Sequence, residues 1–167
     1  MDKSNFLNCE SYCDSKTSLT CKSCEKYTCK ECSCFVAEED FDYFKEIPDE
    51  LKSGVYCPSC YSDGIESHVQ NYQEIMRKAE DVDVFTKIQT AETRLIRKIA
   101  KKISVTDCGD KEEALMRLAF LAASNGYGTI VNVDLVPNKV GSGSYKKQIW
   151  AGSGFPVNPK PKRKQIR

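Results

Sequence analysis

Histidine is almost missing from this chain of 167 residues, in which His68 stands alone. Without other histidines there is no obvious Cys-His dyad, so a cysteine nucleophile lacks its usual base. Long apolar runs are missing as well: the longest, residues 118–123, is far too short to span a bilayer. The first residues lack a positive region followed by an apolar stretch, so no secretory signal is expected. We therefore expect a soluble, non-enzymatic protein of a reducing, cytoplasmic compartment.

The chain as a whole also lacks a strong excess of either positive or negative charge, since its formal net charge is +1. That total hides a split. Up to Glu66 the chain carries 7 basic and 14 acidic residues, whereas the remainder carries 18 basic and 10 acidic ones. The near-neutral total argues against a general polyanion-binding protein, and a local basic surface on the C-terminal part stays open.

Cysteine is abundant in one part of the chain and almost absent from the other. Nine of the ten cysteines lie at or before Cys60, and only Cys108 follows. The same N-terminal segment holds few aliphatic side chains, so burial alone cannot offset its ordering entropy. In a reducing compartment, paired cysteines indicate zinc ligands more than disulfides, and the metal would supply much of the folding free energy.

The N-terminal cysteines fall into four pairs, and eight thiolates make two tetrahedral sites of the kind that hold structural zinc. Two connectivities are open. Neighbouring pairs could share an ion, with residues 25–28 as a tight spacer. Alternatively the pairs interleave: the first and third pairs hold one ion, the second and fourth hold the other, and residues 25–28 form a hairpin turn. Interleaving also explains why the last pair lies so far along the chain. The pairs are Cys9/Cys13, Cys21/Cys24, Cys29/Cys32 and Cys57/Cys60.

The segments "CKSCEKYTCKECSCF" and "GVYCPSCY", within residues 21–61, resemble FYVE-type and FYVE-related cross-brace zinc fingers. The resemblance implies two structural Zn²⁺ ions, an interleaved fold with two small hairpins, and a C-terminal helix. In this reading site 1 is Cys9, Cys13, Cys29 and Cys32, and site 2 is Cys21, Cys24, Cys57 and Cys60.

The chain departs from that family at two places. The first pair, Cys9 and Cys13, has three intervening residues instead of two, so Cys34 or His68 are candidates to replace a ligand there. Members that bind phosphatidylinositol 3-phosphate carry a basic, histidine-rich stretch at the third cysteine, where this chain has residues 17–22 without histidine. Docking of a protein partner is therefore expected ahead of phosphoinositide binding.

The remaining residues predict a compact α+β domain with a helix that links it to the finger. Asp110 followed by Glu113 indicates a helix N-cap with its capping-box partner. Cys108 lies just before this helix start and is a candidate redox or nucleophilic thiol. The patterns predict a helix over 65–80, a strand over 82–88, a helix then a short strand over 91–105, a helix over 111–125, and strands over 129–136 and 145–151.

Residues 112–157, "EEALMRLAFLAASNGYGTIVNVDLVPNKVGSGSYKKQIWAGSGFPV", resemble the YbjQ-like family. The resemblance implies a small α+β domain that commonly forms ring oligomers. The predicted domains are thus a finger over 1–64, a linking helix over 65–81, an α+β domain over 82–157, and a basic tail over 158–167.

The predicted function is that of a zinc-binding adaptor, whose finger docks a protein partner and whose second domain forms a homo-oligomer. A phosphoinositide-binding module is one alternative. A second is nucleic-acid binding through the basic C-terminal part. The acidic stretch of residues 37–50 is either an inserted loop or a recognition surface.

Overall fold

The computed structural model describes residues 17–44, 46–89, 100–141 and 147–158. The chain divides into two compact units, Met1–Gln73 and Glu74–Arg167, which we call the finger unit and the C-terminal unit. Helices and sheets occur in both, so the α+β class is confirmed. In the described part of the chain, no helix has the length and apolarity needed to cross a membrane.

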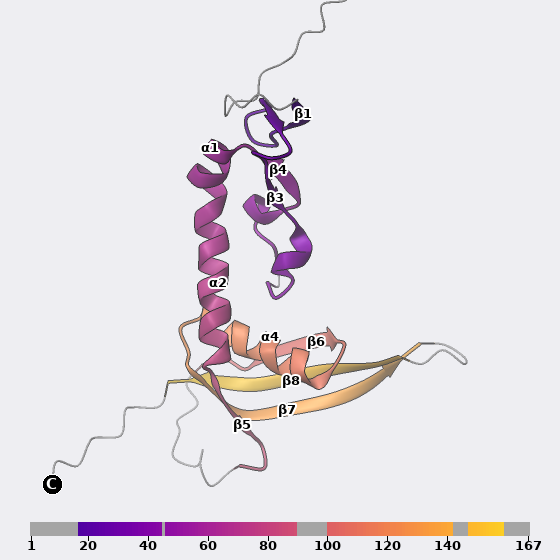
Figure 1. Cartoon of the computed structure of the whole chain (residues 1–167). Coiled ribbons are helices and arrows are strands. Elements are labelled where there is room, and N and C mark those ends of the chain that lie inside the picture. The colour runs from indigo at the N-terminus through magenta and orange to yellow at the C-terminus, as the bar shows by residue number, and fades with distance from the viewer. Residues whose placement is uncertain (1–16, 45, 90–99, 142–146, 159–167) are drawn as a thin grey trace, which may run out of the picture. The chain divides into compact units, whose positions relative to one another are not determined.

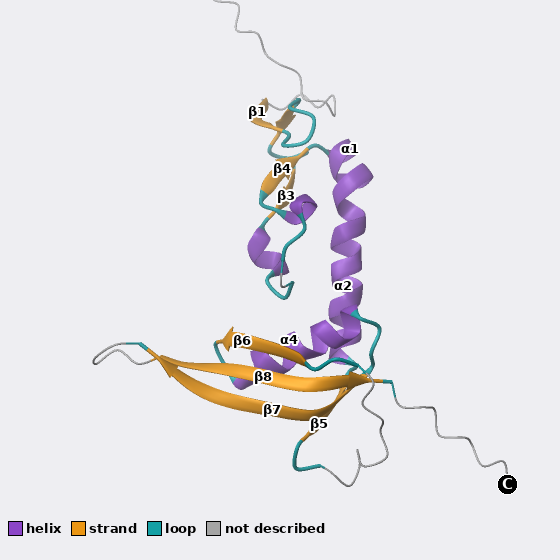
Figure 2. Ribbon diagram, turned by 180° about the vertical axis from the view of Figure 1, so that it is seen from behind, coloured by secondary structure: helices purple, strands orange, loops and turns teal. Residues whose placement is uncertain are grey.

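Two small antiparallel hairpins and the start of a long helix make up the finger unit (Figures 1 and 2). Strand β1 pairs with β2, and β3 pairs with β4. A helical run then starts at Pro58 and continues to Glu80, which confirms the predicted helix and begins it earlier. The elements are β1 (Thr17–Thr20), β2 (Tyr27–Cys29), β3 (Cys34–Val36), η1 (Glu38–Phe41), η2 (Asp49–Leu51), β4 (Gly54–Tyr56), α1 (Pro58–Cys60), η3 (Tyr61–Ile65) and α2 (Glu66–Glu80).

Aromatic side chains contribute to the apolar packing of the finger unit. The rings of Phe41 and Tyr72 meet edge to face with their centroids 5.1 Å apart, and Phe44 approaches Tyr72 at the same distance. Phe41, Leu51 and Tyr72 are buried. The hairpin side of the unit is thereby fixed to one face of α2.

A four-stranded sheet with the order β5-β7-β8-β6 forms the C-terminal unit, and helix α4 lies over it (Figure 2). Strand β5 runs parallel to β7, whereas β8 is antiparallel to both β7 and β6. The elements are β5 (Asp83–Thr86), β6 (Ile103–Cys108), α4 (Lys111–Ser124), β7 (Thr129–Val140) and β8 (Lys147–Val157). The predicted short strand near residue 103 is confirmed, while residues 90–99, where a helix was predicted, lie outside the described residues.

The core of this unit sits between α4 and the central strands. Leu118 and Ala122 of the helix pack with Ile130 and Val133 of β7. Both strand residues join one core because the register shifts between Val131 and Asp134, where Asn132 has φ 54°. A Cβ on Gly154 would lie 2.6 Å from Cγ2 of Ile130, so only glycine lets β8 approach β7 here.

Strands β7 and β8 both extend beyond their predicted C-terminal ends, and each extension contains a proline. The predicted strands end at residues 136 and 151, but Pro137 pairs with Trp150 and Pro156 pairs with Ile130. Pairing of β5 with β7 ends at Val133, and pairing of β6 with β8 ends at Gly154. Each proline therefore lies where its strand has no partner on one side, so its missing N–H breaks no ladder.

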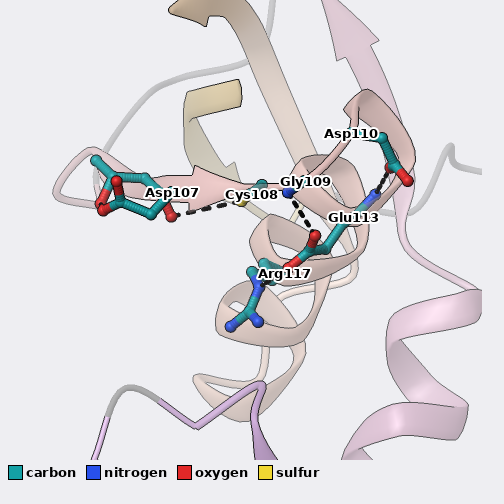
Figure 3. Close-up of polar contacts among 7 residues, drawn as sticks. Asp107, Cys108, Gly109, Asp110, Glu113 and Arg117 are labelled. Atoms are coloured by element: carbon teal, nitrogen blue, oxygen red, sulfur yellow. Dashed lines mark hydrogen bonds and ion pairs between the residues drawn. The ribbon is translucent and has the colours of Figure 1, made fainter. Parts of the chain in front are cut away.

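Helix α4 begins with the predicted cap (Figure 3). The Asp110 side chain accepts a hydrogen bond from the Glu113 backbone N–H at 2.8 Å. The Glu113 carboxylate reaches back to the Gly109 N–H at 2.6 Å and also accepts from Arg117 Nε at 2.8 Å. The carboxylates of Asp110 and Glu113 therefore satisfy backbone donors at the helix start, which confirms the predicted cap.

Candidate metal centre

The pair Cys21 and Cys24 lies in the tight turn that joins β1 to β2. The Cys21 N–H donates to the Lys26 carbonyl and the Glu25 N–H donates to the Cys21 carbonyl, both at 2.9 Å. Glu25 takes φ 60°, a left-handed conformation that glycine adopts most readily. Residues 25–28 were predicted as the turn, but Tyr27–Cys29 form strand β2 and the turn is the Cys21–Cys24 segment itself.

The pair Cys57 and Cys60 stands at the start of the long helix. Cys57 is the N-cap, with φ −72° and ψ 158°, and Pro58 occupies the first turn, where its missing N–H costs nothing. The Tyr61 N–H donates to the Cys57 carbonyl at 3.0 Å. Residues three apart in a helical turn share one face, so both thiols of this pair point the same way.

Lys22 and strand β4 bring these distant pairs together. The Lys22 N–H donates to the Val55 carbonyl at 2.8 Å, and its ammonium donates to the carbonyls of Lys52 at 3.3 Å and Ser53 at 3.1 Å. A Cβ on Gly54 would lie 2.6 Å from Lys22 Cδ. The first turn is thus seated on β4, which leads directly into Cys57.

The sulfur atoms of Cys21, Cys24, Cys57 and Cys60 all lie within 4.8 Å of one another. Cys24 Sγ and Cys57 Sγ are 3.8 Å apart. Zinc–sulfur bonds of about 2.3 Å in a tetrahedron place two sulfurs about 3.8 Å apart, whereas a disulfide needs about 2.05 Å. All four are free thiols, so the donor set and its spacing fit a tetrahedral soft-metal site.

The thiols of this cluster differ sharply in acidity. Burial raises the pKa of Cys21, but hydrogen bonds from the backbone of Cys24, Cys57 and Ser23 outweigh it and lower the pKa to about 6. Burial and contacts with neighbouring thiols raise the pKa of Cys57 to about 12 and also raise that of Cys60. The polypeptide alone thus disfavours the thiolates of Cys57 and Cys60, so a divalent cation that binds them must displace their protons.

The pair Cys29 and Cys32 forms a second turn of similar shape. The Cys32 N–H points at Cys29 Sγ, 3.4 Å away, and the Ser33 N–H donates to the Cys29 carbonyl at 3.0 Å. The predicted partners Cys9 and Cys13 lie outside the described residues. Within the described ranges, the group of Cys21, Cys24, Cys57 and Cys60 is the only one close enough to share an ion, so Cys29 and Cys32 do not join Cys21 and Cys24.

Two other residues, Cys34 and His68, were candidate ligands. Cys34 is in β3, opposite Tyr56, and burial followed by the charge of Glu66 raises its pKa. His68 lies on α2. Among the residues that the structure describes, neither joins the group of Cys21, Cys24, Cys57 and Cys60, and their predicted role at the first site stays a prediction because Cys9 and Cys13 lie outside those residues.

Cys108 has the properties of a packed thiol (Figure 3). Its exposed fraction is 0%, and its Sγ lies 3.6 Å from the Thr106 carbonyl. Burial raises its pKa, and the carboxylate of Glu113 raises it further. A helix start favours a thiolate, but desolvation and the capping carboxylate prevail over it here, so the thiolate needed for attack is disfavoured.

Comparison of the chain with protein families, curated proteins and solved structures yields no match. The resemblances to FYVE-related fingers and to the YbjQ-like family thus stay predictions. The structural role of Lys22 was not predicted from the sequence. Its contact with two β4 carbonyls required the pairing of segments about 30 residues apart, and Gly54 was the one local signal of a close approach.

Proposed function

We propose that this chain is a structural-zinc protein whose finger unit serves as a docking module for another protein. The observation that carries the proposal is the group of four sulfurs, drawn from the β1–β2 turn and from the start of the long helix. Four thiolates close the coordination sphere of zinc and leave no open position for a substrate or a reactive water. Such a site supplies folding free energy and a fixed surface instead of chemistry.

A second zinc completes the proposal. Cys29 and Cys32 already form a turn with an N–H aimed at sulfur, which is the local geometry of the Cys21–Cys24 turn. With Cys9 and Cys13 they would make the first site of an interleaved, FYVE-related cross-brace. The pairing of the second and fourth cysteine pairs supports this connectivity, because it leaves the first and third pairs for each other.

Protein docking is favoured over membrane binding by the composition of β1 and the turn after it. Leu19 is the one large apolar side chain of β1, whose four residues are TSLT. Insertion into a bilayer needs a larger apolar surface with basic residues beside it. The proposal therefore assigns the finger unit to a protein partner, with the C-terminal unit as the part that forms an oligomer.

Native mass spectrometry of the full chain, purified with reductant and without added chelator, tests the metal part of the proposal. We expect two zinc ions per chain and a resolved oligomer. Cys24→Ser with Cys60→Ser should lose one ion, and Cys29→Ser with Cys32→Ser should lose the other. A chain that carries no zinc, or a zinc content that these pairs do not alter, would contradict it.

Proximity labelling in the native cell tests the docking part. The full chain should label a defined set of proteins, and the variant Cys24→Ser with Cys60→Ser should lose them. The variant Cys108→Ala, which alters the one cysteine outside the finger unit, should retain them. Equal labelling by all three chains, or recovery of the full chain on phosphoinositide liposomes above neutral ones, would overturn docking of a protein as the function.

A further inference from the structure

A groove on the finger unit, distinct from the sulfur cluster, lies between β3, η1 and the part of the long helix from Tyr61 to Gln73. Its volume is about 320 Å³. The apolar lining includes Phe35, Phe41, Tyr61, Val69 and Tyr72, and Asp40 stands among them. We call these six residues the aromatic groove.

The floor of the aromatic groove is formed by buried, packed rings, and its rim carries an exposed ring. Phe41 and Tyr72 are buried and in edge-to-face contact, and β3 is held by its ladder with β4. Phe35, in contrast, is 58% exposed, a high value for a phenylalanine in a strand. A preformed apolar site with one exposed aromatic side chain suits an anchor residue of a ligand, because little ordering is needed on binding.

Charge identifies the kind of ligand. Asp40 lines the groove, and Glu39 beside it is exposed. The residues up to Glu66 carry 14 acidic and 7 basic side chains, and each four-thiolate zinc site would add negative charge. Two lysines of this unit are used internally, since Lys22 binds the carbonyls of Lys52 and Ser53, and Lys52 pairs with Asp49.

We propose that the aromatic groove binds a short peptide segment of a partner protein, in which one apolar side chain is flanked by lysine or arginine. The apolar residue enters between Phe35, Val69 and Tyr72, and the flanking cations face Glu39 and Asp40. This inference rests on the proposed docking function and names its surface and its ligand class. The acidic stretch that the sequence left undecided thus becomes the recognition surface.

The experiment is a selection of displayed random ten-residue peptides on the full, zinc-loaded chain, followed by affinity measurement of the enriched peptides. We expect the enriched peptides to share a positive net charge and one aromatic or branched aliphatic residue. Their affinity should fall about tenfold or more with Phe35→Ser and with Asp40→Lys, because both changes remove groove contacts at an exposed position. Raised salt should weaken binding, since the flanking charges are exposed.

Two matched controls lie in the C-terminal unit. Val140→Ser removes another exposed apolar side chain, 52% accessible, and Asp81→Lys reverses another exposed acidic charge. Neither should change peptide affinity. Enriched peptides with no charge preference, or peptides that bind the Phe35 and Asp40 variants as tightly as the unaltered chain, would overturn the groove while leaving the docking function intact.

Zinc content, measured on every variant, separates the two levels of the proposal. A chain without zinc contradicts the proposed function whatever the peptides do. A peptide of residues 158–167, which carries Ile166 among five basic residues, serves as competitor. Displacement of selected peptides by this competitor at equal or lower concentration would overturn the assignment to a partner and identify the chain's own tail as the occupant.

Discussion

The two units of this chain obtain their stability from different chemistry. In the finger unit, the fully buried side chains include Cys21, Cys29 and Cys57, together with Leu51 and Thr28. In the C-terminal unit they are mostly large and apolar, with Phe120, Leu118, Ile130 and Val131 among them. Three of these five finger-unit side chains are thiols, whereas Cys108 is the only buried thiol among the described residues of the C-terminal unit.

This difference teaches that burial has a different meaning in each unit. Burying hydrocarbon is favourable by itself, at about 25 cal/mol per Å² of apolar surface. The buried sulfur cluster of the finger unit stabilises it mainly through metal coordination, in which a cation replaces the protons of Cys57 and Cys60, whose pKa values are raised. The finger unit should therefore respond to metal supply and pH, and the C-terminal unit to core packing.

Metal removal is expected to give the largest effect and to separate the units. Chelation of zinc, or Cys57→Ser, should unfold the finger unit, because structural zinc contributes about 10–16 kcal/mol of apparent binding free energy in small fingers. In amide correlation spectra, resonances of residues 17–73 should collapse to the random-coil region. Those of residues 100–141 should keep their dispersion.

The matched control for metal removal is Cys108→Ala. This thiol is buried but lies outside the sulfur cluster, so zinc content and the finger resonances should persist. Uniform loss of dispersion from both units on chelation would show that they do not differ in the source of their stability.

A cavity in the C-terminal core should give the converse result. Leu118 has no exposed surface and packs on Ile130 and Val133. Leu118→Ala should lower the free energy of unfolding of this unit by about 2–5 kcal/mol, from lost transfer energy and the residual cavity. Denaturant titration followed by the fluorescence of Trp150, the single tryptophan, reports this unit alone. Altered zinc content in this variant would contradict the independence of the two units.

Overpacking at Gly154 is expected to cost less. A Cβ there would lie 2.6 Å from Ile130 Cγ2 and 3.1 Å from Val133 Cγ2, so Gly154→Ala forces β7 or β8 to shift. We expect a loss of about 1–3 kcal/mol in the same titration. Gly128→Ala is the comparison, since nothing lies within 4 Å of a Cβ at that position. Equal stability of the two variants would show that the strands yield without cost.

Local patterns in the sequence predicted most of the C-terminal unit. The 3.6-residue period and the Asp110 cap located α4 to within a residue, and alternation located the first half of β7. The errors lie where tertiary context decides. Ile88 was placed in a strand but is 92% exposed, and the prolines at 137 and 156 are admitted because their strands are unpaired on one side.

The ligand residues of the metal centre could be predicted from the sequence, whereas the backbone contacts that hold them could not. Spacing of C-x-x-C pairs predicts ligands, and the remote pair at residues 57–60 favoured interleaving. The positive φ of Glu25 is a property of the backbone that no residue pattern indicates. The hydrogen bonds from Lys22 to β4 and the residues before it join segments about 30 residues apart, so no local pattern predicts them either. The aromatic groove likewise combines side chains from three separate segments.

The smallest expected effect concerns pH and the cap of α4. The hydrogen bond from Arg117 and then the one from the Gly109 N–H hold the pKa of Glu113 below its ordinary 4.5. A carboxyl with a lowered folded pKa contributes stability that is complete above its unfolded value and is lost as pH falls through the folded value. For a partly exposed pair, 25% and 30% accessible, the contribution is about 1 kcal/mol or less.

Glu113→Gln should therefore lower the free energy of unfolding of the C-terminal unit at neutral pH, with the difference shrinking as pH falls below about 4.5. Trp150 fluorescence in urea, measured at several pH values, records this. Glu112→Gln, one residue earlier and exposed, should shift the curve little. If both variants behave alike at every pH, the carboxylate bridge adds nothing beyond the Asp110 cap, and the stability of this unit comes from its apolar core with no electrostatic share at the helix start.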